Sequence, residues 1–274
     1  MNTTSDLTII IPAKNESILL PRLLTSLTHQ DYSAMPSTKV YVADAGSSDG
    51  TPEIARSFVD RLAIEVIPGG LPGVGRNNGA RLATTACVLF IDADIQLDDP
   101  TLVRRSVELM LRKKLHCVTT NIHCPQGRGF DRVLYATSNA AQQLSRLCRP
   151  FSTGMYMLFD RARFNELGGF HEDALYAEDY LLSKKVARLR FGIVPGHIVT
   201  TNRRFMNMGY LQVARLFVTT ALNTWNDNFF FRDHRYWHSE PRTFTGGVDD
   251  HRLSEIETQG NFATSATSNR WLNT

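Results

Sequence analysis

The chain has 274 residues, of which 42% are hydrophobic, so it is long enough and apolar enough to bury a full core. Its formal net charge is only +3, which argues against a general nucleic-acid-binding protein. The four cysteines lack the close paired spacing of a zinc site, and their pattern does not require an oxidising compartment.

The N-terminal stretch from Met1 to Ile11 has no basic leader before a hydrophobic region. The sequence also contains no apolar run of about 18 residues or more, the length that is needed to span a bilayer. We therefore expect a cytoplasmic protein. The charge is uneven, because nine Lys and Arg residues stand against Glu108 and Asp131 between Thr101 and Pro150. Solvated helix faces would explain this excess, as would a surface for anionic acceptors or lipid headgroups.

Short apolar runs alternate with helical patterns in the first part of the chain. The leucines of residues 20–27 follow helical spacing, for example. Such alternation is typical of a parallel sheet covered by helices, so we expect an α/β fold with a mostly parallel sheet. The runs expected to form strands are Leu7–Ile11, Lys39–Ala43, Ile64–Ile67 and Val88–Ile91.

Each of these expected strands runs into an unusual loop. Ligands in parallel sheets bind outside the carboxyl ends of the strands, where all four loops would lie. Asp92-Ala93-Asp94 follows the last of them and places two carboxylates two positions apart, on one side of the chain. Such oxygen ligands suit Mg²⁺ or Mn²⁺, although Asp is also common in a plain turn.

Two further loops at this edge suggest nucleotide binding. The carboxylate of Asp44 is suited to accept hydrogen bonds from a nucleobase or ribose, although residues 44–51 could simply cap a helix. The glycine-rich loop Gly69–Gly79, which includes Gly73, would let the backbone approach a pyrophosphate, and Arg76 would add a cation at the start of a helix. Neither a Walker loop nor a dinucleotide fingerprint is present.

A second informative region begins near Gly154 and reaches Glu178 and Asp179, where the spacing of the following leucines predicts the start of a helix. Acidic residues favour helix starts through the helix dipole alone. The functional alternative makes Asp179 a general base that takes a proton from an attacking hydroxyl. Farther on, His197 could supply a third metal ligand or be an ordinary core histidine.

Arg203 and Arg204 could neutralise a leaving diphosphate or cap a solvated turn. Beyond them, the spacing predicts an amphipathic helix over Met208–Asn226, and then an aromatic cluster. The cluster could pack on the core, form a dimer interface or contact a membrane surface. Its members are Phe229, Phe230, Phe231, Tyr236 and Trp237, and those of the helix stripe are Leu211, Ala214, Val218, Leu222 and Trp225.

Together these motifs resemble family 2 glycosyltransferases of the GT-A fold, over roughly Leu7 to Phe205. Several motifs in one order are more specific than any one of them. The chain lacks the Gln-x-x-Arg-Trp element of the processive, membrane-embedded members. The elements that carry the resemblance are Ile11-Pro12-Ala13-Lys14-Asn15-Glu16, Asp44 to Thr51, Gly75-Arg76-Asn77, Asp92-Ala93-Asp94, Gly168-Gly169-Phe170 and Glu178-Asp179.

The resemblance implies an inverting transferase that moves a sugar from a nucleoside diphosphate donor to a hydroxyl of a glycan, lipid or small molecule, with Mn²⁺ or Mg²⁺ as cofactor. By this likeness Asp179, together with Glu178, would be catalytic, and Asp92 and Asp94 would hold ribose and metal. Gly154, Arg203 and Arg204 would lie on the acceptor side. The donor-binding residues would be Pro12, Ala13, Glu16, Asp44, Gly73, Arg76, Asp92, Ala93 and Asp94.

The same likeness suggests a glycosyltransferase domain over residues 1–205, with a nucleotide-binding half to about residue 97 and an acceptor half from about residue 98. Residues 206–240 would form a helical extension, with a possible role in a homodimer or at the inner face of a membrane, and residues 241–274 a flexible tail. Two alternatives stay open, a sugar-phosphate nucleotidyltransferase and a non-catalytic module that binds nucleotide sugars.

Overall fold

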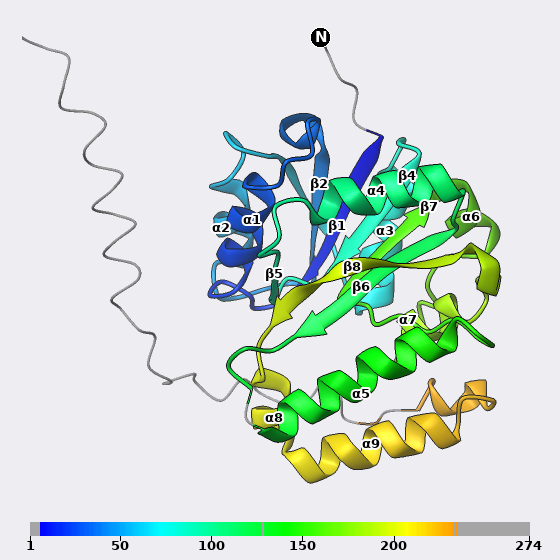
Figure 1. Cartoon of the computed structure of the whole chain (residues 1–274). Helices are drawn as coiled ribbons and strands as arrows, with labels where there is room; N and C mark the ends of the chain where they lie inside the picture. Colours follow the sequence, from blue (N-terminus) through cyan, green and yellow to red (C-terminus); the bar gives the residue numbers. More distant parts are fainter. Residues whose placement is uncertain (1–5, 128, 233, 235–274) are drawn as a thin grey trace, which may run out of the picture. The chain divides into compact units, whose positions relative to one another are not determined.

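A single mixed sheet forms the centre of the fold, as the computed structural model in Figure 1 shows. The structure describes residues 6–127, 129–232 and 234, without the side chains of residues 204, 205 and 207. The described residues form eight strands in the order β3-β2-β1-β4-β7-β6-β8-β5. The strands are β1 Leu7–Ala13, β2 Lys39–Asp44, β3 Ala63–Pro68, β4 Cys87–Ile91, β5 Ile95–Gln96, β6 Cys117–His123, β7 Tyr156–Asp160 and β8 Phe191–Thr200.

Helices alternate with these strands through most of the described chain. The longer ones are α1 Leu20–Thr28, α3 Pro72–Leu82, α4 Leu102–Lys113, α5 Gly129–Ser145 and α9 Tyr210–Leu222. Short helices are α2 Thr51–Arg56, α6 Arg161–Glu166, α7 Glu178–Ser183 and α8 Arg203–Met208, and single 3₁₀ turns are Met35–Ser37, Arg188–Arg190 and Asp227–Phe229.

The strands β1 to β4 run parallel to one another, as the alternation of strands and helices predicts. β7 lies antiparallel between β4 and β6, β8 runs parallel to β6, and β5 pairs antiparallel with β8. The prediction of an α/β fold with a mostly parallel sheet is therefore confirmed. Because β7 pairs with β4, the chain just before β7 lies beside the end of β4, which brings Gly154 close to Asp92.

Two hydrophobic clusters cover the two faces of the sheet, because side chains alternate along each strand. Ile9 and Ile11 of β1 join α1 and α4 in one cluster, whereas Ile10 joins α3, α6 and α7 in the other. The leucines of α1 that the sequence predicts as a buried stripe are all fully buried. β4 is buried along its whole length, so its chain emerges from the core only at Asp92.

Most of the expected glycine-rich loop is helical, which corrects the sequence prediction. Proline at the first turn starts α3 at Pro72, and the glycines let this helix approach the sheet closely. A Cβ added at Gly75 would lie 3.2 Å from the Cβ of Ala43, and one at Gly79 would lie 2.6 Å from Ile10. The glycine signal therefore reflects helix packing along most of this segment.

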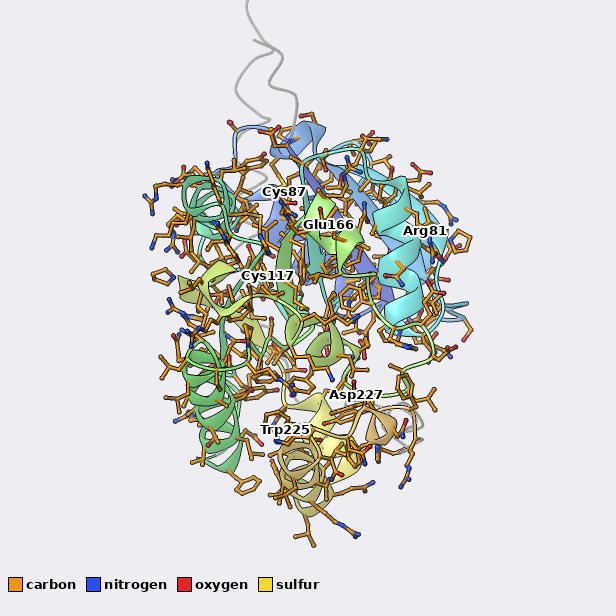
Figure 2. All side chains as sticks on the ribbon, turned by 90° about the vertical axis from the view of Figure 1, so that its right-hand side faces the viewer. Arg81, Cys87, Cys117, Glu166, Trp225 and Asp227 are labelled. Atoms are coloured by element: carbon orange, nitrogen blue, oxygen red, sulfur yellow. The ribbon has the colours of Figure 1, made fainter. Side chains whose placement is uncertain are left out.

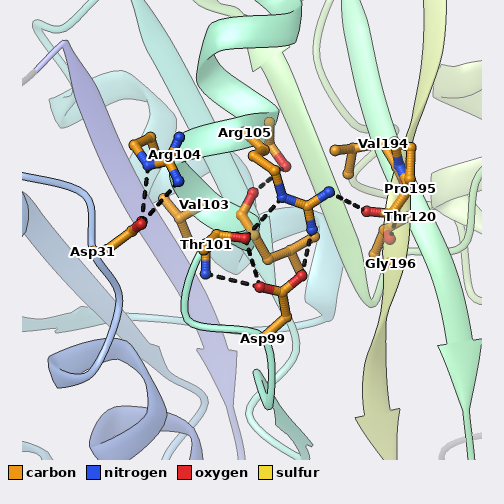
Figure 3. A network of polar contacts seen from close by, with 12 residues as sticks. Asp31, Asp99, Thr101, Val103, Arg104, Arg105, Thr120, Val194, Pro195 and Gly196 are labelled. Atoms are coloured by element: carbon orange, nitrogen blue, oxygen red, sulfur yellow. Dashed lines mark hydrogen bonds and ion pairs between the residues drawn. The ribbon is translucent and has the colours of Figure 1, made fainter.

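A polar network fixes the start of α4 to β8 (Figure 3). Arg105 donates to the hydroxyl of Thr101 at 2.8 Å and to the carbonyl of Pro195 at 2.7 Å, and it pairs with Asp99. Arg104 pairs with Asp31 at 2.9 Å, which ties α4 to the segment after α1. The network thus joins the loop after β5 and the start of α4 to β8 and to the segment after α1.

The C-terminal helix is confirmed, but its predicted apolar stripe faces outward. α9 packs on the core through Val213 and Leu216, whereas Leu211 and Trp225 are among the most exposed of the large hydrophobic side chains described. Phe230 is fully buried, in line with the packing interpretation of the aromatic cluster. Tyr236, Trp237 and the expected tail over residues 241–274 lie outside the described residues. Among the helices the structure describes, none is both long and apolar enough to cross a membrane.

Gly79→Ala tests the contact between α3 and β1. Alanine favours a helix over glycine by about 1 kcal/mol, but its Cβ would overlap the β-branched side chain of buried Ile10, which costs about 1–3 kcal/mol. We expect a net loss of up to about 2 kcal/mol in the free energy of unfolding in urea. Gly129→Ala, where a Cβ meets nothing within 4 Å, is the matched control and should show no loss.

Candidate active site

Arg76 connects the two acidic motifs. It is buried in α3, and its Nη2 donates to Oδ1 of Asp92 at 2.6 Å. Its Nη1 donates to Glu178 at the start of α7, and the guanidinium stacks over the ring of Phe170 at 5.2 Å. Burial lowers the pKa of Arg76, but the carboxylates of Asp92 and Glu178 outweigh it and raise that pKa further above its ordinary value. The sequence predicts Arg76 as a donor contact; here its guanidinium holds protein carboxylates.

Asp179 is held by backbone amides on either side. The amide of Gly154 donates to its Oδ2, and the amide of Tyr180 donates to its Oδ1 at 2.7 Å. Burial and the neighbouring charge of Glu178 together raise the pKa of Asp179 to about 7, against the lowering effect of Arg76 and the two backbone hydrogen bonds. A carboxyl group with a pKa near neutrality is suited to accept a proton in catalysis.

Gly154 fills the space between Arg76 and Asp179. A Cβ there would lie 2.7 Å from Nη2 of Arg76 and 3.3 Å from Oδ2 of Asp179. Its carbonyl also accepts a hydrogen bond from Arg76 at 3.4 Å. Asp92 and Asp179 are therefore connected through Arg76 and Gly154, and they lie at the same edge of the sheet. The sequence predicts Gly154 on the acceptor side, and in the structure it lies between Arg76 and Asp179.

A second arginine joins Glu16 to Asp94. Arg203, at the start of α8, donates to both carboxylate oxygens of Glu16 at 2.9 and 2.5 Å, and to Asp94 at 3.4 Å. Burial raises the pKa of Glu16 to about 7 even though the hydrogen bond from Arg203 acts in the opposite direction. Arg203, expected on the acceptor side, therefore lies beside the predicted donor residues. The side chain of Arg204 lies outside the part of the chain that the structure describes.

Hydrogen bonds connect the loop after β2 to the loop after β1. The amide of Glu16 donates to Oγ1 of Thr51 at 2.8 Å, and the amide of Ser17 donates to Asp49 at 3.0 Å. Oδ2 of Asp44 accepts two backbone amides within its own loop. Its Oδ1 is buried without a hydrogen-bond donor in the described part of the chain. A buried carboxylate oxygen of this kind calls for an external donor.

Pro12, Ala13 and Gly73 line this edge through packing. Pro12 and Ala13 end β1 and pair in register with Ala43 and Asp44 of β2. Gly73, in the first turn of α3, lies against the start of α7, because a Cβ there would be 3.6 Å from Cγ of Glu178. These residues shape the site without offering a charged group.

His197 does not join the acidic pair, in contrast to the predicted metal set. It lies exposed on β8, opposite Asn121 of β6, and its ring is 5.1 Å from that of His123. Strand alternation explains the difference, because Ile198 and Thr200 turn into the core and residue 197 turns away from it. Among the described residues, no group of three or more His, Cys, Asp or Glu side chains could hold a metal ion.

Asn77, Phe170 and Ala177, for which the sequence predicts no role, support the site. Asn77 Nδ2 donates to the carbonyl of Phe170 at 2.8 Å, and its Oδ1 accepts the amide of Phe170 at 3.0 Å. These two hydrogen bonds hold the backbone of Phe170 in place, and with it the ring beneath Arg76. Ala177 adopts a left-handed backbone with φ of 51°, directly before Glu178. The Gly-Arg-Asn and Gly-Gly-Phe motifs are the only sequence signals that could have pointed to the first two.

The sequence model named Glycosyl transferase family 2 matches residues 8–169, more than half of the chain. The chain belongs to this family. The match includes Glu16, Asp44, Arg76 and the Asp92–Asp94 pair, and ends before Glu178 and Asp179. The resemblance expected from the motifs is thus confirmed at the level of the family.

Relatives at the sequence level match only part of the chain. Validoxylamine A glucosyltransferase of Streptomyces hygroscopicus subsp. jinggangensis is 37% identical over 93 residues, which are 32% of this chain and 22% of that protein. Glycosyltransferase AglE of Haloferax volcanii is 37% identical over 100 residues, 34% of this chain and 32% of that protein. The matched segment thus spans about a fifth to a third of the length of these relatives.

Solved structures show the GT-A fold over nearly the whole chain. S. aureus TarS 1-349 in complex with UDP-GlcNAc has a TM-score of 0.59 at 20% identity, covering 93% of this chain and 80% of that one. Mannosyltransferase PcManGT from Pyrobaculum calidifontis in complex with GDP-Man and Mn²⁺ has a TM-score of 0.58 at 19% identity, covering 96% and 82%. At these identities the likeness establishes the fold alone.

Glu16→Gln tests the electrostatics around Arg203. A carboxyl pKa raised from 4.5 to about 7 means that the folded state binds this proton more tightly than the unfolded state. The stabilisation is therefore complete below about pH 4.5 and is lost as the pH rises through about 7. We expect the free energy of unfolding of the wild type minus that of Glu16→Gln, measured with urea in metal-free buffer, to fall over this range by on the order of 1–3 kcal/mol. A difference that is constant or rises with pH would contradict the burial of this carboxyl.

Proposed function

We propose that the protein is a metal-dependent, inverting glycosyltransferase that moves a sugar from a nucleoside diphosphate donor to a hydroxyl acceptor. The main supporting observation is that Arg76 and Gly154 hold Asp179 at the same sheet edge as Asp92 and Asp94. This arrangement suits a base that faces the sugar next to a site for the diphosphate.

The donor side is supported by the edge formed after β1, β2 and β4. Pro12, Ala13 and Asp44 lie where nucleotides bind in open α/β sheets, and the unpaired oxygen of Asp44 could accept a hydrogen bond from a nucleobase. Structural neighbours are described with UDP-GlcNAc and with GDP-Man, which favours a nucleotide sugar of this general kind.

The acidic pair fits a hard divalent cation such as Mn²⁺ or Mg²⁺. Asp92 and Asp94 offer carboxylate oxygens, and the described residues bring no third His, Cys, Asp or Glu side chain to them, so phosphate oxygens of the donor and water would complete the coordination. When bound, the ion would stabilise negative charge on the leaving diphosphate. A neighbouring structure is described with Mn²⁺, which supports the class of ion.

The residues of the chain would divide the chemistry as follows. Asp179 accepts the proton of the acceptor hydroxyl, whose oxygen forms a bond to the anomeric carbon of the sugar while the bond from that carbon to the diphosphate breaks. A single displacement of this kind inverts the anomeric carbon. Arg76 and Gly154 orient the carboxylate of Asp179, and Arg203 adds a positive charge near the diphosphate site.

Asp179→Asn tests the base. Asparagine keeps the size of the side chain but cannot accept the proton, so sugar transfer should fall by about 10²–10⁴-fold. A thermal-shift panel of UDP, GDP and TDP sugars with Mn²⁺ identifies the donor, and product formation with a panel of hydroxyl acceptors reports transfer.

Asp173→Asn, an exposed change on the same segment, is the control for this variant and should transfer sugar at the wild-type rate. Undiminished transfer by Asp179→Asn, with donor binding intact, would rule out its role as base. Pyrophosphate release from a nucleoside triphosphate and a sugar phosphate would favour a nucleotidyltransferase. Donor binding without turnover on any acceptor would favour a binding module.

Asp94→Asn tests the metal. In the wild type, Mn²⁺ should increase the thermal stabilisation produced by the donor, which reaches about 2.7 kcal/mol when the ligand is at 100 times its Kd. Asp94→Asn should lose the part that depends on Mn²⁺, whereas Asp98→Asn, an exposed change four residues later, should keep it. Equal responses of both variants to Mn²⁺ would contradict a metal site at the acidic pair.

A further inference from the structure

We propose that the outward sides of α5 and α9 bind the surface of an anionic lipid bilayer. The face consists of residues 129–149 and 210–226, and we call it the α5–α9 face. It holds nine of the fifteen large hydrophobic side chains that are exposed among the described residues. This proposal goes beyond the proposed glycosyl transfer and does not depend on it.

The exposed stripe of α9 is an organised surface. Leu211, Val218 and Leu222 of α9, and Trp225 in the turn just after it, recur at helical spacing and are 86%, 59%, 76% and 82% exposed, respectively. The opposite side of the same helix packs inward through Val213 and Leu216. An amphipathic helix that turns its apolar side outward has no partner for that side within the described protein. Apolar patches of this kind mark interaction sites.

α5 adds a second apolar stripe beside the first. Phe130, Val133 and Leu144 are exposed along α5, which lies next to α9 (Figure 1). Phe130 contacts the ring of Tyr210 at 5.4 Å, where α9 begins. Where α5 and α9 end, Arg149 lies 4.3 Å over the ring of Trp225, so the helices are joined near both ends. Figure 2 shows Trp225 at this end of the molecule.

The charge of the α5–α9 face has one sign. Arg132, Arg146 and Arg215 are exposed on it, and Arg149 is partly exposed. The one acidic residue of these two ranges, Asp131, is fully buried. Apolar side chains among arginines match the acyl boundary and anionic headgroups of a bilayer, and tryptophan favours this interface. A second copy would instead place these arginines against like charges, so charge complementarity favours the bilayer.

The inner side of α9 leads to the candidate active site. Leu216 shares a cluster with Tyr180 of α7, and the hydroxyl of Tyr180 donates to the carbonyl of Thr224 at 3.2 Å. Tyr180 follows Asp179 directly. A bilayer docked on the α5–α9 face would therefore lie against the helix that packs on α7.

Vesicle co-sedimentation of the full chain tests the proposal, with phosphatidylcholine vesicles that contain or lack phosphatidylglycerol. The wild type should bind the anionic vesicles, and about 1 M salt, which shortens the Debye length to about 3 Å, should weaken binding. Leu211→Ser with Leu222→Ser should weaken binding about tenfold or more, because each leucine loses its apolar contact. Arg132→Gln with Arg215→Gln should do the same by removing two charges.

The matched controls are Val59→Ser with Leu111→Ser, which are 52% and 51% exposed elsewhere, and Arg112→Gln with Lys113→Gln on α4. Both control pairs should bind like the wild type. A cooperative urea-unfolding transition with the wild-type midpoint would verify that every variant is folded. The proposal is overturned if the wild type does not bind anionic vesicles, or if the test pairs bind as the wild type does. It is also overturned if ultracentrifugation shows a dimer that the leucine pair dissolves, without vesicle binding.

Discussion

The candidate site depends on one buried interaction, in which the guanidinium of Arg76 is held between Asp92 and Glu178. Removing such charges from water costs several kcal/mol per ion, and only close pairing with good hydrogen bonds offsets this cost. The pairing joins the end of β4 to the start of α7. The fold therefore cannot satisfy Arg76 without also bringing Asp179, the next residue after Glu178, to the edge where Asp92 and Asp94 emerge.

Arg203 forms the second link, and the two arginines differ in burial. The side chain of Arg76 is 3% exposed, whereas that of Arg203 is 30% exposed between Glu16 and Asp94. Arg76 thus fixes the geometry of the site from within the protein. Arg203 starts a short helix at the surface and reaches the same acidic pair from the other side, so it can move with less rearrangement of the core.

The sequence predicts those parts of this arrangement that depend on local pattern. The strand that ends at Asp92 follows from a short apolar run, and α1 follows from its leucine spacing. The link from Arg76 to Glu178 spans 102 positions, and no local pattern encodes it. Glycines mark both loops and close helix packing, so the sequence predicts a loop over Gly69–Gly79, most of which is helical in the structure. A helical stripe does not reveal which way it faces, so the exposure of Leu211 and Trp225 needed the structure.

The most direct test of the central claim is a crystal structure with Mn²⁺ and the nucleoside diphosphate chosen by thermal shift, with the ion located by its anomalous signal. We expect an anomalous peak at Asp92 or Asp94, with Arg76 still paired to Glu178 and the carboxylate of Asp179 open to the donor side of the site. A peak away from both aspartates, or an Asp179 turned away from the nucleotide, would contradict this claim.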